Sequence, residues 1–491
     1  MSIINFTALK ELGKAYGLRN SNDISMFDDL WELYQVGNKF KRDNEEEMKA
    51  AVEQAYGVLT DIVSGRPNTG AHGLRRQATT GAEKIVIFSD HHMTHRGHRH
   101  DYFYRFNFNL YKEVLKRYAD LGYTLVENGD VEELVIFEPT KAETEKRRKL
   151  VRRPLLVDDV GTIDWEELVG VRIEKRRRQL EQLLNDNKEY YDLVKSRFGR
   201  SRFFKISGNH DAYTSAELEG IVESAFWEGI IKDILLVRRP NGPTGGTKYA
   251  ITHGHQFDEV CVPPFAKQAG ETISECLSWA FQGPDRIWRV SDTMRWNSNA
   301  QKEFSNVLSG SSTITTHNAV IENVLDAFKT HDVAWEYFEN SNPDLAFVRE
   351  VCTGDEFFKF RHMNETTLFN TLLPFWNALP EFPTLICGHT HEPRDRARFT
   401  NLMARTFQLT NVPVPPNYRP PGTNDVNLAT RYMNTGSAGR FENLIWCIEI
   451  NGDTAKIHSW SNKGTAGNIT LRKVRWDSND NGKLIGTETK P

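Results

Sequence analysis

The fold is decided by the stretch KIVIFSDHH at residues 84–92, in which the apolar run 85–88 leads into Asp90, His91 and His92. A short run of β-branched and aromatic residues bounded by polar ones is typical of a buried strand. Four more polar clusters follow apolar runs in the same way: Gly129-Asp130, Gly208-Asn209-His210-Asp211, His253-Gly254-His255 and Gly388-His389-Thr390-His391. We therefore expect five polar clusters, each at the carboxyl end of a strand.

These strand ends are expected to meet. In open α/β sheets ligands bind at the carboxyl edge, so residues as far apart as Asp90 and His391 can share one site. The side chains offer carboxylate oxygen, amide oxygen and imidazole nitrogen without thiolate, a set that suits Mn, Fe, Zn or Co. One carboxylate can bridge two ions about 3.5 to 4 Å apart, which is the arrangement that clamps a phosphoryl group during displacement. The residues thus predict a two-metal centre that hydrolyses a phosphoester.

The ordered clusters resemble the D-x-H, G-D, G-N-H-D/E, H and G-H-x-H blocks of the calcineurin-like metallophosphoesterases. The resemblance covers roughly residues 83–460 without two insertions, and Asn434-Thr435-Gly436-Ser437 resembles the N-x-G-S segment that often follows. It implies an α/β (α+β) fold with a two-sheet β-sandwich core flanked by helices. It also implies two divalent transition-metal ions, for example manganese, and a metal-bridging hydroxide as nucleophile. The implied ligands are Asp90, His92 and His391 for the first ion, Asn209, His253 and His389 for the second, and Asp130 as the bridge.

Four further residues are candidates for catalysis or substrate binding. By the same resemblance, His210 matches the family's catalytic histidine, which would protonate or stabilise the leaving group. Asp211 either orients His210 or caps the following turn. Arg96 and Arg99 follow the first cluster closely enough to touch the phosphate, although exposed loop arginines commonly have no such role.

Two local features bear on the type of phosphoesterase and on the role of His91. The protein Ser/Thr phosphatase branch carries Asp-Arg-Gly shortly after its Gly-Asp, whereas Asp130 is followed here by Val-Glu-Glu-Leu, which argues against a phosphoprotein phosphatase. His91 should face away from Asp90 and His92 because side chains alternate along a strand. We expect it to pack or to make a supporting hydrogen bond.

Alternative interpretations exist for each cluster and for the whole chain. A single Gly-Asp or Gly-His after a strand is ordinary turn chemistry. No folding requirement puts five such clusters in this order, so a metal site is favoured over turns and over a binding protein on a retired phosphoesterase fold. A small-molecule phosphodiester is the favoured substrate and a phosphomonoester the second choice. A nuclease acting on single strands would be favoured by a groove lined by the basic runs 146–153 and 175–178, although such runs are usually solvated helix faces.

Composition fits an enzyme of the cytoplasm. The 491 residues have a net charge of −4, which gives no global attraction to nucleic acid. No apolar run approaches the roughly 18 residues of a membrane span, and the first residues lack the pattern of a secretory signal. Five scattered cysteines suit a reducing compartment better than a disulfide framework.

The chain divides into five expected segments. Residues 1–64 are predicted as an N-terminal helical extension and 65–82 as a linker. The first part of the metallophosphoesterase core spans 83–262, with a helix expected over 104–118 and a charged, long surface helix within 139–200. Residues 263–380 are rich in Trp and Phe and are interpreted as a helical cap over the site. Residues 381–491 complete the core, with strands 444–450 and 454–460 joined by a hairpin and expected to form a second sheet.

Overall fold

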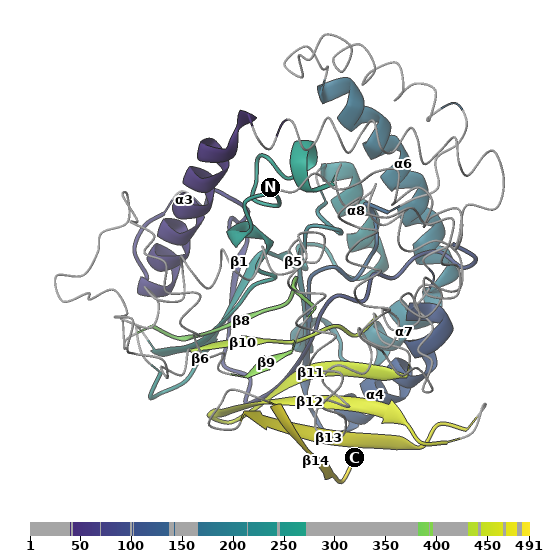
Figure 1. The fold of residues 1–491 in the computed structure, drawn as a ribbon. Helices are drawn as coiled ribbons and strands as arrows, with labels where there is room; N and C mark the ends of the chain where they lie inside the picture. Colours follow the sequence, from purple (N-terminus) through teal and green to yellow (C-terminus); the bar gives the residue numbers. More distant parts are fainter. Residues whose placement is uncertain are drawn as a thin grey trace, which may run out of the picture.

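The computed structural model describes residues 40, 43–136, 142, 165–271, 382–395 and 431–491, apart from short gaps at 69, 99–100, 102, 214, 243–245, 392, 440–442, 465–467 and 479–483. Within these ranges the chain is α/β, with two mixed sheets and several helices (Figure 1). Most of the expected cap, 272–380, lies outside the described residues. So do residues 1–39 and nearly all of 137–164.

The larger sheet has eight strands in the order β14-β13-β12-β11-β2-β3-β4-β5. Four parallel neighbours form one half: β2 (Lys84–Phe88), β3 (Thr124–Asn128), β4 (Phe203–Ile206) and β5 (Ile231–Lys232). An antiparallel set forms the other: β11 (Leu444–Asn451), β12 (Thr454–Asn462), β13 (Leu471–Ser478) and β14 (Leu484–Thr489). The predicted hairpin between β11 and β12 is confirmed. Its expected membership of a second sheet is wrong, because β11 pairs with β2 and extends the first.

The smaller sheet has six strands in the order β1-β6-β7-β8-β10-β9. Their bounds are β1 (Gln77–Thr80), β6 (Ile234–Arg238), β7 (Thr247–Ile251), β8 (Thr384–Cys387), β9 (Arg394–Asp395) and β10 (Tyr432–Asn434). β7, β8 and β10 are parallel neighbours. The interpretation of 65–82 as a linker is wrong in part, because β1 lies within it and pairs in parallel with β6.

The two sheets pack face to face through one apolar core. Ile85 and Ile87 of β2 share this core with Tyr249 and Ile251 of β7. Alternate residues of β2, such as Phe88, point to the opposite face and join a second core with the helices. Side chains alternate between the two faces of β2, and both faces are covered by apolar cores. Its sequence is therefore continuously apolar.

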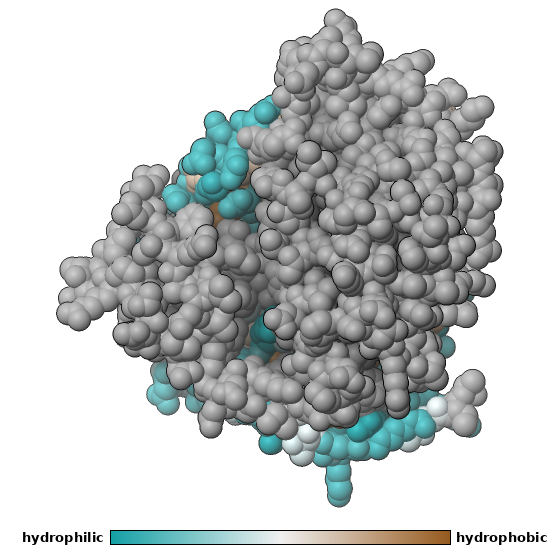
Figure 2. All heavy atoms as spheres, in the orientation of Figure 1, coloured by the Kyte–Doolittle hydropathy of each residue, from teal (hydrophilic) through white to brown (hydrophobic). Residues whose placement is uncertain are grey.

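Helices cover the outer face of each sheet (Figure 1). α3 (Glu45–Ser64) packs on the six-stranded sheet and confirms helix in this part of the N-terminal extension. The eight-stranded sheet is covered by α4 (Phe108–Asp120), preceded by a π-helical turn (Phe103–Asn107), and by α6 (Trp165–Asp186), α7 (Lys188–Arg197) and α8 (Ala216–Ala225). Short helical turns span Arg200–Arg202, His255–Phe257 and Lys267–Glu271. Hydrophilic side chains gather on the outer surface of α3 and of the C-terminal strands (Figure 2). No helix among the described residues is long and apolar enough to cross a membrane.

The charged excursion differs from its prediction in two ways. The expected single helix is interrupted at Asn187, whose buried amide donates to the carbonyl of Thr94 at 3.0 Å. The basic run 175–178 is not a uniformly solvated face. Lys175 and Arg176 are each 2% exposed, and Arg176 forms an ion pair with Glu271.

Candidate metal centre

The five polar clusters meet where the two sheets come together. Three follow β2, β3 and β4 of the eight-stranded sheet, and two follow β7 and β8 of the six-stranded sheet. The loops that carry Asp90 and Asp130 are joined through the backbone, since the amide of Asp90 donates to the carbonyl of Gly129 at 3.0 Å. The convergence predicted from the sequence is therefore confirmed, but at a junction of two sheets rather than at the edge of one open sheet.

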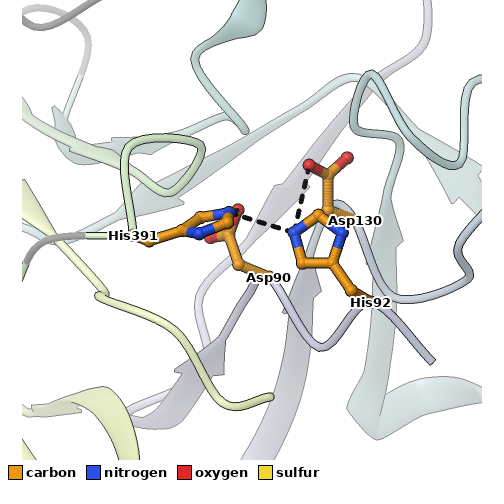
Figure 3. A group of neighbouring side chains, drawn as sticks. All are labelled: Asp90, His92, Asp130 and His391. Carbon is orange, nitrogen blue, oxygen red and sulfur yellow. Dashed lines mark hydrogen bonds and ion pairs between the residues drawn. The ribbon is translucent and has the colours of Figure 1, made fainter. Parts of the chain in front are cut away.

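The first group of converging side chains comprises Asp90, His92, Asp130 and His391 (Figure 3). One ligand atom from each lies within 4.8 Å of the others. His391 Nε2 is 3.1 Å from Asp90 Oδ1 and 3.0 Å from His92 Nε2. His92 Nε2 is 3.9 Å from Asp130 Oδ2. Imidazole nitrogens and carboxylate oxygens thus surround one point, as a first transition-metal ion requires.

The second group comprises Asp130, His253 and His389, with ligand atoms again within 4.8 Å of one another. His253 Nε2 is 3.2 Å from Asp130 Oδ2 and 3.2 Å from Asn209 Oδ1, so the amide belongs to this group. Asp130 is common to both groups. The donor sets of N and O atoms fit two divalent ions that share one carboxylate.

Comparison with protein-family models, curated proteins and solved structures finds no match.

Backbone strain is concentrated at the converging residues. Among the described residues that are not glycine, seven have a positive φ, and five of them are predicted metal ligands. These five are Asp90 (57°), His92 (48°), Asp130 (53°), His389 (71°) and His391 (63°). A side chain in this left-handed region costs conformational energy, on the order of 1 kcal/mol or more per residue, and such strain clusters at functional sites.

Glycine before three of the ligands makes room for the ligand of another loop. A Cβ at Gly129 would overlap the ring of His253, and a Cβ at Gly208 would overlap the carboxylate of Asp130. At Gly388 it would overlap the hydroxyl of Ser89 and the carboxylate of Asp90. The Gly-Asp, Gly-Asn and Gly-His pairs in the sequence therefore reflect close packing between loops and not only turn geometry.

Glu133 contacts two histidines of the centre, His92 and His210. Its Oε2 lies 2.8 Å from Nδ1 of His92 and 2.8 Å from Nδ1 of His210. The carboxylate is itself held by the backbone amides of Val135 and Ile136, each donating to Oε1 at 2.8 Å. Burial would raise the pKa of Glu133, but the neighbouring histidine charges outweigh it and lower the pKa well below its usual range.

His210 is set up to carry a proton at neutral pH. Burial alone would lower its pKa, but the charges of Glu133 and Asp130 raise it to about 9. With Nδ1 on Glu133, the nitrogen that remains for a substrate is Nε2. The His210 side chain is 13% exposed, so it can be reached from solvent.

Asp211 does not have the first of its two predicted roles. Its carboxylate accepts from the amide of Gly208 at 2.5 Å and from that of Val131 at 3.0 Å, and it lies 3.5 Å from Lys205 Nζ. It therefore caps its own turn and ties it to the loop after β3. The carboxylate that contacts the His210 ring is that of Glu133.

The structure describes the surroundings of His91 and Arg96 but not those of Arg99. His91 is buried away from the centre, packs edge-on against Phe103 and Tyr111, and lies 3.3 Å from Glu127, as expected. Arg96 stacks over the ring of Tyr104 at 4.4 Å, which gives its guanidinium a structural contact. Arg99 lies outside the described residues.

Sequence reasoning missed two carboxylates, Glu133 and Asp258. Asp258 Oδ2 lies 3.0 Å from Nε2 of His389. Each had a signal, because Glu133 is three residues after Asp130 and Asp258 is five residues after His253. Metal-binding histidines commonly donate the N–H of their second ring nitrogen to a carboxylate or carbonyl, so an acidic residue near each cluster is a candidate partner.

Proposed function

We propose that this protein is a phosphoesterase that works with two divalent metal ions and hydrolyses small-molecule phosphodiesters. One observation carries the proposal: two groups of nitrogen and oxygen donors share Asp130, and His210, held by Glu133, adjoins them. A shared carboxylate between two ions next to an acid is the arrangement that phosphoryl displacement needs.

The residues of the two donor groups would bind different ions and share Asp130. Asp90, His92 and His391 would hold one ion, Asn209, His253 and His389 the other, and Asp130 both. When bound, such ions lower the pKa of water and offset charge on phosphoryl oxygens.

The chain's own contribution to proton transfer is His210. Glu133 fixes its ring through Nδ1, so Nε2 presents the proton to the leaving-group oxygen. The amide of His210 donates to Asp130 Oδ1 at 2.8 Å, which ties the acid to the shared carboxylate. This hydrogen bond holds the acid at a fixed place relative to the shared carboxylate.

Two alternatives to a phosphodiesterase that acts on small molecules are a phosphomonoesterase and a nuclease. The preference for a diester derives from the aromatic segment 263–380, and a phosphomonoester remains the second choice. A nuclease loses part of its support, because Lys175 and Arg176 of one basic run are buried and cannot line an open groove as a solvated face would.

Metal content is the first measurement. We expect the purified protein, after incubation with Mn²⁺ or Zn²⁺, to retain about two ions per chain, because two donor groups share one bridge. Elemental analysis after gel filtration checks this. A content below about one ion per chain would contradict the metal centre itself.

Substrate profiling tests the proposed function. The metal-loaded protein is offered bis-p-nitrophenyl phosphate, p-nitrophenyl phosphate, cyclic nucleotides and single-stranded DNA, with Asp130→Asn as a matched negative control. We expect the diester to be cleaved fastest. A faster monoester reaction would replace diester by monoester, and a protein that holds two ions but cleaves no ester would refute the function.

The pH dependence tests the role of Glu133. The charge of Glu133 raises the pKa of His210, and the acid form dominates below that pKa, so hydrolysis that needs this proton should decline as the pH rises through it. Glu133→Gln removes the negative charge that raises this pKa. We expect the alkaline limb of kcat against pH to move to lower pH in this variant, and an unchanged limb would exclude His210 as the acid.

A further inference from the structure

Helix α6 contacts two loops of the candidate metal centre, although it belongs to the charged excursion between β3 and β4. Its last residue, Asp186, accepts from the amide of Arg96 at 3.0 Å, in the loop that follows His92. Two turns earlier, Gln179 contacts the loop that follows Asp130. Side chains of this helix can therefore influence the geometry of the centre.

Gln179 is a buried amide that holds both ends of the turn 133–136. The residue is 4% exposed, and its Nε2 donates to the carbonyl of Glu133 and, at 3.2 Å, to that of Ile136. The reverse orientation of the amide would place its oxygen against two carbonyl oxygens, which cannot donate. The amide consequently has one favourable orientation, in which it clamps the turn.

The other side of this turn holds His210. The amide of Leu134 donates to the carbonyl of His210 at 3.1 Å, and the carboxylate of Glu133 lies 2.8 Å from Nδ1 of its ring. The same carboxylate accepts from the amide of Ile136 at 2.8 Å, so its direction depends on the conformation of the turn. A side chain that fixes the turn thereby fixes the partner of the His210 ring.

We propose that Gln179 is a positioning residue for acid catalysis: it clamps the turn that directs the Glu133 carboxylate, and Glu133 holds the His210 ring toward the leaving group. The inference rests on the proposed function, in which His210 is the acid. Gln179 acts through Glu133 and does not touch the reacting atoms. The charged excursion then contributes to the reaction as well as to the packing of the fold.

The alternative interpretation is that Gln179 only provides a donor for two buried carbonyls. Removing a purely structural amide lowers the thermal midpoint, because buried acceptors lose their partner, and it slows all esters to the same extent. Loss of a positioning residue slows mainly the substrates whose leaving group needs the proton. The two interpretations therefore differ in how the rate depends on the leaving group.

Gln179→Met tests the proposal, since methionine has nearly the length of glutamine but no donor. We expect kcat on phosphodiesters of alkyl alcohols to fall about tenfold. On bis-p-nitrophenyl phosphate, whose leaving group departs without a proton, kcat should fall less than about twofold. KM and metal content, measured on the same sample, should stay within about twofold of the wild type. An equal loss of kcat on both esters would overturn the proposal.

Asn187→Leu is the matched control. Asn187 is a second buried amide of the same excursion, and it donates to the carbonyl of Thr94 at 3.0 Å and not to the turn that carries Glu133. This variant should lower the thermal midpoint about as much as Gln179→Met without changing the ratio of the rates on the two esters. If it changed that ratio equally, the effect would come from loosening the excursion, and the proposal would be wrong.

The double variant Gln179→Met/His210→Ala shows whether Gln179 acts through His210. Two residues that act through one interaction are not additive. We therefore expect the double variant to be no slower on alkyl esters than His210→Ala alone. A further loss of about tenfold in the double variant would mean independent effects and would contradict the proposal.

The position of the ring can also be followed without hydrolysis. The Nδ1 proton of His210, shared with Glu133, should give a downfield NMR signal in the Zn²⁺-loaded protein that is missing in His210→Ala. We expect this proton to exchange with water about tenfold faster in Gln179→Met than in the wild type or in Asn187→Leu. An unchanged exchange rate would refute the positioning role.

Two further outcomes are assigned in advance. If Gln179→Met does not give a cooperative melt, Gln179→Asn takes its place with the same expectations, because its amide is one carbon shorter and cannot reach both carbonyls. A wild-type protein that binds two ions but cleaves no ester would refute the proposed function. The exchange rate of the His210 proton would then still decide whether Gln179 positions the ring.

Discussion

Asp130→Asn is expected to abolish hydrolysis and to weaken the binding of both metal ions. Asp130 is the one residue common to the two donor groups, and it is 1% exposed. The amide removes the negative charge shared by two cations while preserving the shape of the side chain. The rate should fall by more than about a thousandfold, since the loss combines metal binding with transition-state charge stabilisation.

Metal content and rate measured on the same sample check this expectation. Glu449→Gln is a suitable control, because Glu449 is a buried carboxylate on β11 that contacts Lys473 and Tyr118 and not the centre. It should retain two ions and full activity. If Asp130→Asn lost only one ion, Asp130 would be a ligand of a single site and the bridge would be wrong.

His210→Ala is expected to retain both ions and to slow kcat about a hundredfold or more, the usual contribution of a general acid. The residue is bound to Glu133 through Nδ1 and touches the centre through its backbone amide, which the substitution preserves. In the proposed mechanism the side chain would supply the proton and would not belong to the ligand set. Metal content, kcat and KM of the variant are the quantities to measure.

The leaving group gives this experiment an internal control. Nitrophenolate departs without a proton, so the loss in His210→Ala should shrink on nitrophenyl esters and remain large on esters of alkyl alcohols. An equal loss on both would point to a role other than acid catalysis. Release of the metals by the variant would show that His210 belongs to the ligand set.

The sequence predicted the strand ends but not the sheets they belong to. The runs before Asp90, Asp130 and His253 are apolar because both faces of each strand are covered, and this can be read locally. Whether two strands pair is decided by contacts between distant segments. β11 pairs with β2, although a separate second sheet was predicted for it. β1 pairs with β6, although a linker was predicted there.

The partners of charged residues likewise cannot be predicted from the local sequence. Asp211 adjoins His210 in sequence, yet the turn directs its carboxylate to Gly208 and Val131, and the partner of His210 comes from 77 residues earlier. Arg176 lies in a run of four basic residues but is buried by an ion pair with Glu271. Local spacing indicates which residues are present at a site, whereas burial and pairing depend on the completed fold.

The left-handed backbone at five of the predicted ligands has an evolutionary consequence. Glycine adopts a positive φ without penalty, so replacing Asp90, Asp130 or His391 by glycine in the metal-free chain should relieve strain and repulsion, and the thermal midpoint of the apoprotein should rise. A lineage freed from its need for metals would then have a thermodynamic incentive to discard these side chains early. On this expectation the stability of the metal-free chain gives no reason for these five side chains, whereas ion binding would give one.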